Sequence, residues 1–398
     1  MKKVLFLNYC YMGQGTYHRC YQLAKYLADS GVEVDLICST AKNWDWRIRY
    51  FALHHGLRLI TLPGVIRPGH PLGYLLRTLI GIFWILTHRY DLVHAFAVAL
   101  PSTAIPAWFA KRVCRLPLVV DWDDAWGDGY QEMFGKLAHR TIAHLERSTP
   151  RWAKPDAVTA VSDYFVRQFE RLEIPKHKIN RLSNGADTAV IRPLPKAVAR
   201  KKLGIGADEI IVMSMGHNYF SSLEILLESF ELVRGELSSA KLYMVGQILK
   251  VGRWAKRTDE IWKKFSHLEK SIVHCGEVDY QREMSFYLSS ADVLVLPMEV
   301  SVLDQARAPI RIGDYLAAGR PIASNALGYA REILSLAPCA KVNSNPSDAR
   351  ELGRNIVQLL RDKEISEQMG RAGRELAEGS MNWQSLGQQL LLLYNRLE

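Results

Sequence analysis

The feature that most constrains the fold is an alternation of short apolar segments with amphipathic segments, which runs along the chain twice. In the first half, apolar segments such as VLFLNY, VEVDLIC and LPLVVDW are separated by stretches whose apolar residues recur at helical spacing. This order is typical of a parallel sheet covered by helices. The pattern stops after residue 190 and resumes with EIIVMSMG and KLYMVGQ. The sequence therefore predicts two Rossmann-like α/β domains.

The domain boundaries follow from composition. Residues 191–208 hold two prolines and five basic residues without a strand pattern, which is typical of a linker. We therefore expect an N-terminal domain over residues 1–190 and a C-terminal domain over residues 209–378. Residues 379–398 are predicted to form a last amphipathic helix that packs back on the domains. Ligands of such sheets bind beyond the carboxyl ends of the strands, so a cleft between the two domains is expected.

Composition also narrows the class of protein. The six cysteines are scattered, with no Cys-x-x-Cys pair, so neither a zinc site nor a disulfide framework is predicted. A net charge of +10 favours an acidic partner, such as a membrane surface or a phosphorylated ligand. The basic stretch is interleaved with aliphatic rather than stacking aromatic residues, so we expect no nucleic acid partner. The opening run VLFLNYCYMGQG is too short for a signal peptide, and a cytoplasmic protein is expected.

The first candidate binding site is the turn GQGTYHR after the first apolar segment. Gly15 lets a ligand approach the backbone closely, and Arg19 lies one turn into the following helix, where its charge opposes the helix macrodipole. An anionic ligand or a carboxylate partner would compensate that charge. Two alternatives stay open. The segment is either a tight turn with Arg19 at the surface, or an NAD(P) fingerprint whose third glycine position holds His18.

The second candidate site is RAPIRIGDYLAAGRPI. Pro309 suits the first position of a helix, and Gly319 suits the residue just past its end. Arg311 and Asp314 then share one face of that helix. An arginine at a helix N-terminus is favourable when a diphosphate binds there, and a carboxylate beside it would accept hydrogen bonds from a ribose diol. The alternative is an ion pair between Arg311 and Asp314 on the helix surface.

Residues 46–90 contain six arginines and no Asp or Glu. Within them, PLGYLLRTLIGIFWILTHR is apolar nearly all round. Because Arg77 leaves only about ten clear apolar residues, where a membrane span needs about 20, this helix is not expected to cross a bilayer. Two hypotheses stay open: the helix packs inside the domain, or it docks on an anionic membrane surface, with Arg77 and Trp84 contributing to lipid binding.

Several motifs, taken in their order, resemble the retaining GT-B glycosyltransferases of family 4. PIRIGDYLAAGRPI resembles the donor-site segment of that family, and HCGEV followed by YLSSADVLVLPM resembles the segment that leads to it. Asn184, Gly185 and Asp187 match an Asn-Gly-x-Asp signature. DLVHAF and LPLVVDWDDAW resemble the strands of the N-terminal domain that face the acceptor. The resemblance covers nearly the whole chain.

The resemblance implies transfer of a sugar from a UDP- or GDP-sugar to a glycan or lipid-linked glycan, with retention, in cell-envelope polysaccharide or glycoconjugate synthesis. The nucleotide-sugar is a co-substrate, and no other cofactor is implied. The residues assigned to the donor are Gly15, Arg19, Asn184, Gly216, His217, Arg311 and Asp314. His94 and Asp124 are the catalytic candidates, because both follow or end strands that face the acceptor. No paired carboxylates stand at metal-binding spacing, so no catalytic metal is predicted.

Three departures from the family pattern accompany the resemblance. The first of the family's two glutamates falls on Ala306 in this chain. The turn MSMGHNYFSS lacks the arginine and lysine that hold the diphosphate, and His94 is followed by Phe96 where a second histidine is common. A catalytically inactive nucleotide-binding scaffold of the same fold therefore stays an alternative.

Overall fold

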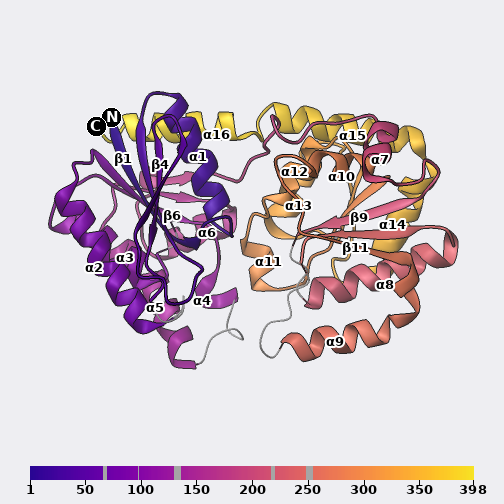
Figure 1. Ribbon diagram of the computed structural model, residues 1–398, viewed down its shortest axis with the longest axis horizontal. Coiled ribbons are helices and arrows are strands. Elements are labelled where there is room, and N and C mark those ends of the chain that lie inside the picture. The colour runs from indigo at the N-terminus through magenta and orange to yellow at the C-terminus, as the bar shows by residue number, and fades with distance from the viewer. Residues whose placement is uncertain (66–69, 97, 130–135, 217–219, 248–253) are drawn as a thin grey trace. The chain divides into compact units, whose positions relative to one another are not determined.

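The computed structural model describes residues 1–65, 70–96, 98–129, 136–216, 220–247 and 254–398 (Figure 1). The chain divides into two compact units. The N-terminal unit comprises Met1–Asn184, Ala306–Ala308 and Trp383–Glu398, and the C-terminal unit comprises Gly185–Gln305 and Pro309–Asn382. Each unit is built on its own sheet covered by helices, so the predicted pair of α/β domains is confirmed.

The N-terminal unit contains an eight-stranded sheet in the order β3-β4-β2-β1-β5-β6-β7-β8. All neighbours pair in parallel except β3 and β4, which form an antiparallel pair at one edge. Strand β1 lies in the middle and is buried along most of its length, which explains its nearly continuous apolar run. The strands are β1 (Lys3–Tyr11), β2 (Glu33–Ser39), β3 (Arg49–His54), β4 (Leu57–Leu62), β5 (Leu92–Phe96), β6 (Leu118–Trp122), β7 (Ala157–Ala160) and β8 (Ile179–Arg181).

Helix α16 completes the core of the N-terminal unit. Its residues Trp383, Leu386, Leu390 and Leu393 share one apolar cluster with α1 and β1. The helix predicted over residues 379–398 thus spans Trp383–Asn395 and packs on α1 (Figure 1). The helices of this unit are α1 (Tyr17–Asp29), α2 (Pro71–Thr87), α3 (Pro101–Arg112), α4 (Trp126–Gly129), α5 (Lys136–Ala153), α6 (Asp163–Arg171), the 3-10 turn η1 (Lys176–Lys178) and α16.

The C-terminal unit contains a six-stranded sheet, parallel throughout, in the order β11-β10-β9-β12-β13-β14. The strands are β9 (Ile211–Met215), β10 (Lys241–Val245), β11 (Ile272–Gly276), β12 (Val293–Leu296), β13 (Ile322–Ser324) and β14 (Ala340–Val342). The helical segments are α7 (Lys196–Leu203), α8 (Phe220–Glu236), α9 (Trp254–Lys264), η2 (Ser266–Ser271), α10 (Met284–Ser290), α11 (Val302–Ala306), α12 (Arg311–Ala317), α13 (Gly328–Leu334), α14 (Ala349–Arg361) and α15 (Lys363–Glu378).

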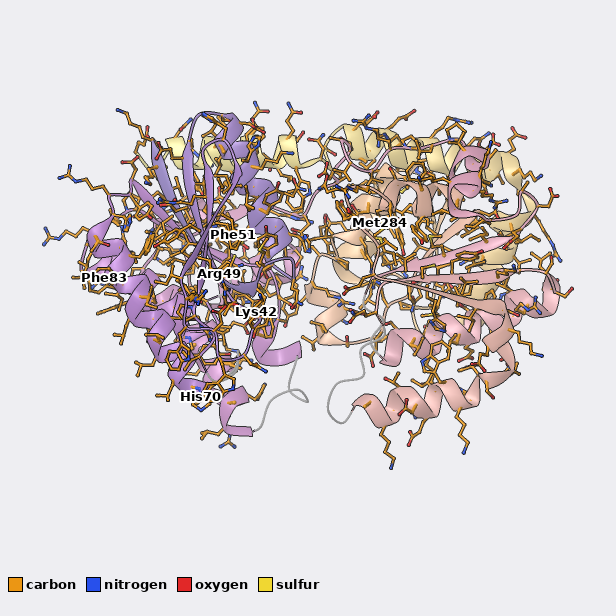
Figure 2. All side chains as sticks on the ribbon, viewed as in Figure 1. Lys42, Arg49, Phe51, His70, Phe83 and Met284 are labelled. Carbon is orange, nitrogen blue, oxygen red and sulfur yellow. The ribbon has the colours of Figure 1, made fainter. Side chains whose placement is uncertain are left out.

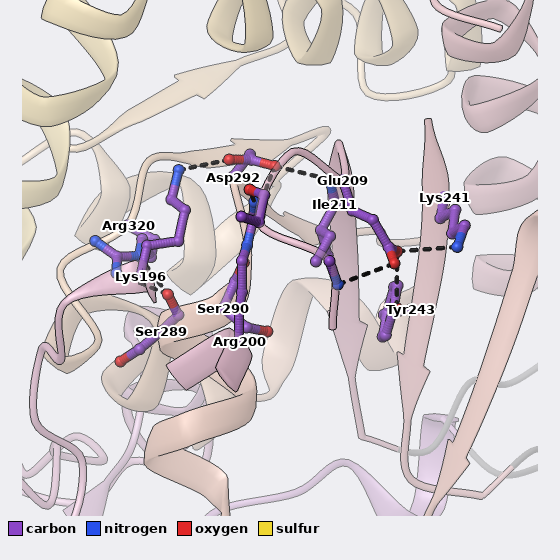
Figure 3. A network of polar contacts seen from close by, with 12 residues as sticks. Lys196, Arg200, Glu209, Ile211, Lys241, Tyr243, Ser289, Ser290, Asp292 and Arg320 are labelled. Atoms are coloured by element: carbon purple, nitrogen blue, oxygen red, sulfur yellow. Dashed lines mark hydrogen bonds and ion pairs between the residues drawn. The ribbon is translucent and has the colours of Figure 1, made fainter. Parts of the chain in front are cut away.

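The segment predicted as a linker, residues 191–208, is a structured part of the C-terminal unit. It includes α7, whose Arg200 is 4% exposed. The guanidinium of Arg200 and the ammonium of Lys196 both pair with Asp292, which also accepts a hydrogen bond from the Ile211 amide (Figure 3). Two of the five basic residues that indicated a linker, Lys196 and Arg200, are therefore paired with a single carboxylate distant in sequence. The first boundary between the units lies instead at Asn184 and Gly185.

Gly387 provides a test of how α16 docks. A Cβ atom at this position would lie 2.2 Å from Cγ of Tyr26 on α1, so alanine cannot fit without moving the helix. We expect Gly387→Ala to lower the free energy of unfolding by about 1–3 kcal/mol, the usual cost of overpacking. Gly235→Ala is the matched control, because a Cβ there meets nothing within 4 Å and α8 gains helix propensity. Equal stability of the two variants in urea unfolding would contradict this docking.

Candidate functional site

The turn before α1 has the backbone geometry that its glycines predict. Gly13 and Gly15 adopt φ values of +79° and +53°, which favour glycine over other residues. A Cβ on Gly15 would lie 3.1 Å from Sγ of Cys10, so the turn and the end of β1 are closely packed. Gly15 is exposed, and its carbonyl accepts a hydrogen bond from the His18 amide. The assignment of Gly15 to the donor remains a prediction.

Arg19 differs from its predicted role, because every N–H of its guanidinium is already paired inside the N-terminal unit. Nε and Nη2 donate to the two carboxylate oxygens of Asp121 at 3.0 and 2.8 Å. Nη2 also donates to the Leu182 carbonyl, and Nη1 donates to the Ser183 carbonyl and to Oδ1 of Asn184. A guanidinium has five N–H donors, and all five are accounted for. The compensating group is therefore a buried carboxylate, and Arg19 offers no hydrogen to a diphosphate.

Asn184 also serves the interior of its own unit. Its side chain is 8% exposed; Oδ1 accepts from Arg19, and Nδ2 donates to the Ala308 carbonyl at 2.6 Å. These contacts join the end of the segment after β8 to residues 306–308, which belong to the same unit. In the described structure Asn184 holds backbone in place, and its assignment to the donor stays a prediction.

His94 is a core histidine, which corrects its assignment as a catalytic residue. It lies in β5 and is fully buried. Its Nδ1 shares a 2.6 Å hydrogen bond with the hydroxyl of Tyr394, and its Nε2 lies 3.4 Å from Oγ1 of Thr159. Burial, reinforced by the charge of Arg19, lowers the pKa of His94 well below its ordinary value. A neutral imidazole with no exposed atom cannot accept a proton from an acceptor hydroxyl.

Two carboxylates follow β6 at its carboxyl end. Asp124, the predicted catalytic acid, is partly exposed, and its Oδ1 accepts from the Ala125 amide. Asp123 accepts a 2.5 Å hydrogen bond from Thr16 on Oδ2, while its Oδ1 has no hydrogen-bond partner among the described residues. Burial, with repulsion from Asp121 and Asp124, raises the pKa of Asp123 to about 7. Asp123, which the sequence offers beside Asp124 as an acceptor of a hydrogen bond from the substrate hydroxyl, is therefore the carboxylate of this pair whose Oδ1 has no partner among the described residues.

Glu146 supports the loop that follows this pair. Its two carboxylate oxygens accept hydrogen bonds from the amides of Trp126 and Gly127 at 2.9 and 2.8 Å. Burial raises the pKa of Glu146 to about 8. A glutamate on the apolar face of the amphipathic helix α5 is the signal by which the sequence could have indicated a buried acid.

In the C-terminal unit, glycines shape the carboxyl ends of β9 and β10. Gly216 adopts a φ of +102° and donates its amide to the Val245 carbonyl at 2.8 Å. Gly246 adopts a φ of +106°, and a Cβ there would lie 2.8 Å from the Gly216 carbonyl oxygen. These two turns therefore pack backbone against backbone, which only glycine allows. His217, the next residue predicted to bind the donor, lies outside the described residues.

Arg311 lies beside Gly216. It is the first residue of α12, and its Nη1 donates to the Met215 carbonyl at 2.7 Å. A Cβ on Gly216 would stand 3.3 Å from the same Nη1, so the guanidinium packs on the glycine backbone. The structure thus brings together two of the residues predicted to bind the donor, at the end of β9.

Asp314 lies one turn further along α12. It is 3% exposed, and Oδ1 accepts a 2.6 Å hydrogen bond from the hydroxyl of Tyr280. Burial, opposed by the hydrogen bond from Tyr280 and helped by the nearby charge of Asp187, raises the pKa of Asp314 to about 7. The alternative of a surface ion pair with Arg311 is wrong, because this carboxylate is buried. Tyr280 was missed because nothing in its local sequence links it to a helix 34 positions away.

The described residues contain no group of three or more His, Cys, Asp or Glu side chains that could hold a metal ion. The candidate site residues of the C-terminal unit are instead Gly216, Arg311 and the buried carboxyl of Asp314.

Solved structures define the class of this fold. Sucrose-phosphate synthase from Thermosynechococcus elongatus matches with a TM-score of 0.78 at 18% identity, over 100% of this chain and 99% of that chain. The Anabaena protein HepE, solved with UDP and glucose, matches with a TM-score of 0.73 at 16% identity, over 100% of both chains. The fold is therefore that of the GT-B glycosyltransferases.

Family models identify the group. Residues 14–185 match the glycosyl transferase 4-like domain, and residues 209–362 match glycosyl transferases group 1. The chain belongs to the group 1, family 4-type glycosyltransferases, which confirms the resemblance found in the sequence. This membership does not support the alternative of an NAD(P)-dependent enzyme.

Curated relatives match only part of the chain. A GDP-mannose-dependent monoacylated alpha-(1-6)-phosphatidylinositol monomannoside mannosyltransferase of Corynebacterium glutamicum is 24% identical over 242 residues, 59% of this chain and 61% of the relative. A putative teichuronic acid biosynthesis glycosyltransferase of Bacillus subtilis is 22% identical over 262 residues, 61% of this chain and 62% of the relative. The chain spans about three fifths of the length of the relatives it matches.

The buried acids predict a pH dependence of stability. The folded pKa of Asp314, about 7, exceeds its unfolded value, so its contribution is full below about pH 4 and is lost as pH rises through 7. Between about pH 5.5 and 8.5, Asp314→Asn should therefore gain about 2 kcal/mol of stability relative to the parent. Urea unfolding at both pH values measures this change. Asp208→Asn, at an exposed position of the same unit, is the control. Parallel curves for all three proteins would contradict a proton bound at Asp314.

Proposed function

We propose that this glycosyltransferase moves a hexose from a UDP- or GDP-sugar to a glycan or lipid-linked glycan, with retention, in cell-envelope polysaccharide or glycoconjugate synthesis. The observation that carries the donor assignment is Arg311 packed on the bare backbone of Gly216 at the end of β9. One relative is named as GDP-mannose-dependent, and one structural neighbour was solved with UDP and glucose; both support this class of donor.

In this proposal each C-terminal residue has a distinct task. The positive φ of Gly216, and the absence of a side chain there, let a diphosphate approach the end of the strand. Arg311 supplies the cation that stabilises the charge developing on the leaving diphosphate. Asp314, oriented by Tyr280, accepts hydrogen bonds from the ribose hydroxyls.

The acceptor side of the proposal rests on Asp123 and Asp124. Oδ1 of Asp123 is buried and has no partner among the described residues, so an acceptor hydroxyl has to displace its surroundings to reach it. A group with a pKa of about 7 can then accept a proton from that hydroxyl or return one near neutral pH. Thr16 holds the other oxygen and so fixes the orientation of the carboxylate. Asp124, partly exposed, would bind a second hydroxyl of the acceptor.

The donor assignment predicts the effect of one substitution. Arg311→Ala should weaken the binding of UDP or GDP by about 1.5–3 kcal/mol, roughly 10- to 150-fold in Kd, because a charge-assisted hydrogen bond is lost. Isothermal titration with both nucleotides measures the change. Arg282→Ala is the matched control, since its side chain is 86% exposed. Unchanged affinity of Arg311→Ala for both nucleotides would remove Arg311 from the donor site.

The charge carried by Arg311 also leads us to propose that transfer needs no metal ion. We expect the rate of sugar transfer to be unaffected by excess EDTA, because the leaving diphosphate is stabilised by a side-chain cation. The measurement is product formation, with and without EDTA, across a panel of UDP- and GDP-sugars. A strict requirement for added manganese would overturn metal independence, and transfer from none of the donors would favour the inactive scaffold.

We further propose that the protein acts as a peripheral protein on the cytoplasmic face of a membrane, where lipid-linked acceptors are presented. In the described part of the chain, no helix is both long enough and apolar enough to cross a bilayer. Any attachment formed by these residues would therefore be made at the surface of the bilayer.

A further inference from the structure

Helix α2 has apolar residues on both of its faces. One face packs on α3, where Gly81 approaches Pro106 closely enough that a Cβ would stand 3.1 Å from Cγ. The opposite face carries five large apolar side chains that are each 54–61% exposed: Leu72, Leu75, Leu79, Phe83 and Leu86. Their spacing of three and four residues places them in one stripe, which we call the α2 stripe. Figure 2 shows Phe83 at the outer edge of the unit.

The expectation that Arg77 and Trp84 contribute to lipid binding is wrong, because both side chains lie on the buried face of α2. Arg77 is 2% exposed; its Nη1 lies 3.4 Å from the Pro63 carbonyl, and its guanidinium covers the ring of Tyr74. Trp84 is 5% exposed and donates its indole N–H to the hydroxyl of Tyr90. Neither side chain is available to a lipid. The packing hypothesis therefore holds for one face of this helix, whereas docking on a membrane stays a prediction, for which only the face left uncovered within the described structure is available.

Exposed aromatic residues border the helix. Tyr50 on the edge strand β3 is 56% exposed, and its ring lies 5.9 Å from that of Trp84. The loop before β3 presents Trp44 and Trp46, which are 66% and 59% exposed. This loop reaches α2 through Gly64, whose amide bonds the Asp45 carbonyl and whose own carbonyl lies against Gly73. Tryptophan and tyrosine are the side chains that favour a membrane–water interface.

Exposed cations border the α2 stripe. Residues 46–120 contain nine Lys or Arg and a single acid, Asp91, and neither α2 nor α3 contains any acid. Several of these cations are already paired or buried: Arg49, Arg58 and Lys111 pair with Asp45, Asp35 and Asp156, and Arg77 is 2% exposed. Arg47 and Arg89, which flank the exposed aromatic residues and the end of α2, are both exposed. A second copy of the chain would oppose these cations with like charge, whereas an anionic bilayer complements both the cations and the apolar stripe.

We propose that the α2 stripe is a docking surface for an anionic lipid bilayer, with α2 lying in the plane of the interface. From Leu72 to Leu86 the stripe is about 21 Å long at 1.5 Å per residue, so a helix lying flat presents all five side chains to the acyl boundary. Trp44, Trp46 and Tyr50 then sit at the level of the head groups. This inference rests on the proposed function, because it names the surface on which a lipid-linked acceptor is met.

Vesicle flotation of the full chain tests the proposal. The vesicles are pure phosphatidylcholine or equal parts phosphatidylcholine and phosphatidylglycerol, without nucleotide. We expect binding to the anionic vesicles that weakens as salt rises. The double substitution Leu75→Gln and Phe83→Gln should reduce partitioning at least about tenfold. The matched control, Leu336→Gln with Leu392→Gln, changes side chains that are 58% and 57% exposed elsewhere in the chain, and should bind like the parent.

Four results would overturn the docking surface. They are failure of the parent to bind either vesicle, equal binding by the parent and the α2 double variant, equal loss in the control variant, and a parent dimer in sedimentation that the α2 substitutions dissociate. The last would make a second copy the occupant.

Titration with UDP and GDP separates this inference from the proposed function. A chain that binds vesicles but neither nucleotide keeps the docking surface and loses the proposed function. A chain that binds a nucleotide but no vesicle keeps the proposed donor site and loses the docking surface.

Discussion

The buried pair of Arg19 and Asp121 is the interaction on which the N-terminal unit most depends. It joins helix α1 to strand β6, and the same guanidinium binds three acceptors in residues 182–184, where the first segment of the unit ends. Two buried charges are tolerated only when every donor is satisfied, and here all five are. Asp123, two residues beyond Asp121, takes its position from this anchored strand, so the candidate acceptor carboxylate depends on a pair that itself touches no substrate.

The sequence predicted the helices and strands better than it predicted which side chains pair with one another. The helix expected to start near Pro309 and to end before Gly319 spans Arg311–Ala317, because its limits depend on residues within it. Arg19 lies 102 positions from Asp121, and a charge that opposes a helix dipole indicates equally a ligand or a buried acid. His94 posed the same problem. A histidine in an apolar strand can lie either in the core or at the edge of a site. The hydrogen bond from Tyr394, 300 positions away, shows that His94 lies in the core.

Helix α2 shows the limit of periodicity as a guide. A helix that is apolar all round indicates burial on every side, yet here only one face is covered by described residues. Its arginine lies on the covered face, contrary to the usual expectation that charge points outward. In the C-terminal unit, by contrast, Gly216 and Arg311 could be assigned to one place, because the end of a parallel strand and the start of a helix meet by topology.

Helix α16 belongs to the core of the N-terminal unit. Almost all other residues of that unit lie before residue 185, about 200 positions earlier in the chain. The ribosome produces a chain from its N-terminus, so the first sheet emerges long before the helix that covers it. Until residues 383–395 follow, Leu23 and Leu27 lack the part of their cluster that α16 supplies, and His94 lacks the hydroxyl of Tyr394. The C-terminal unit contains no residue beyond 382, so no later segment is needed to complete its core. The order of synthesis and the order of completion are therefore reversed, and the unit translated first is the last to close.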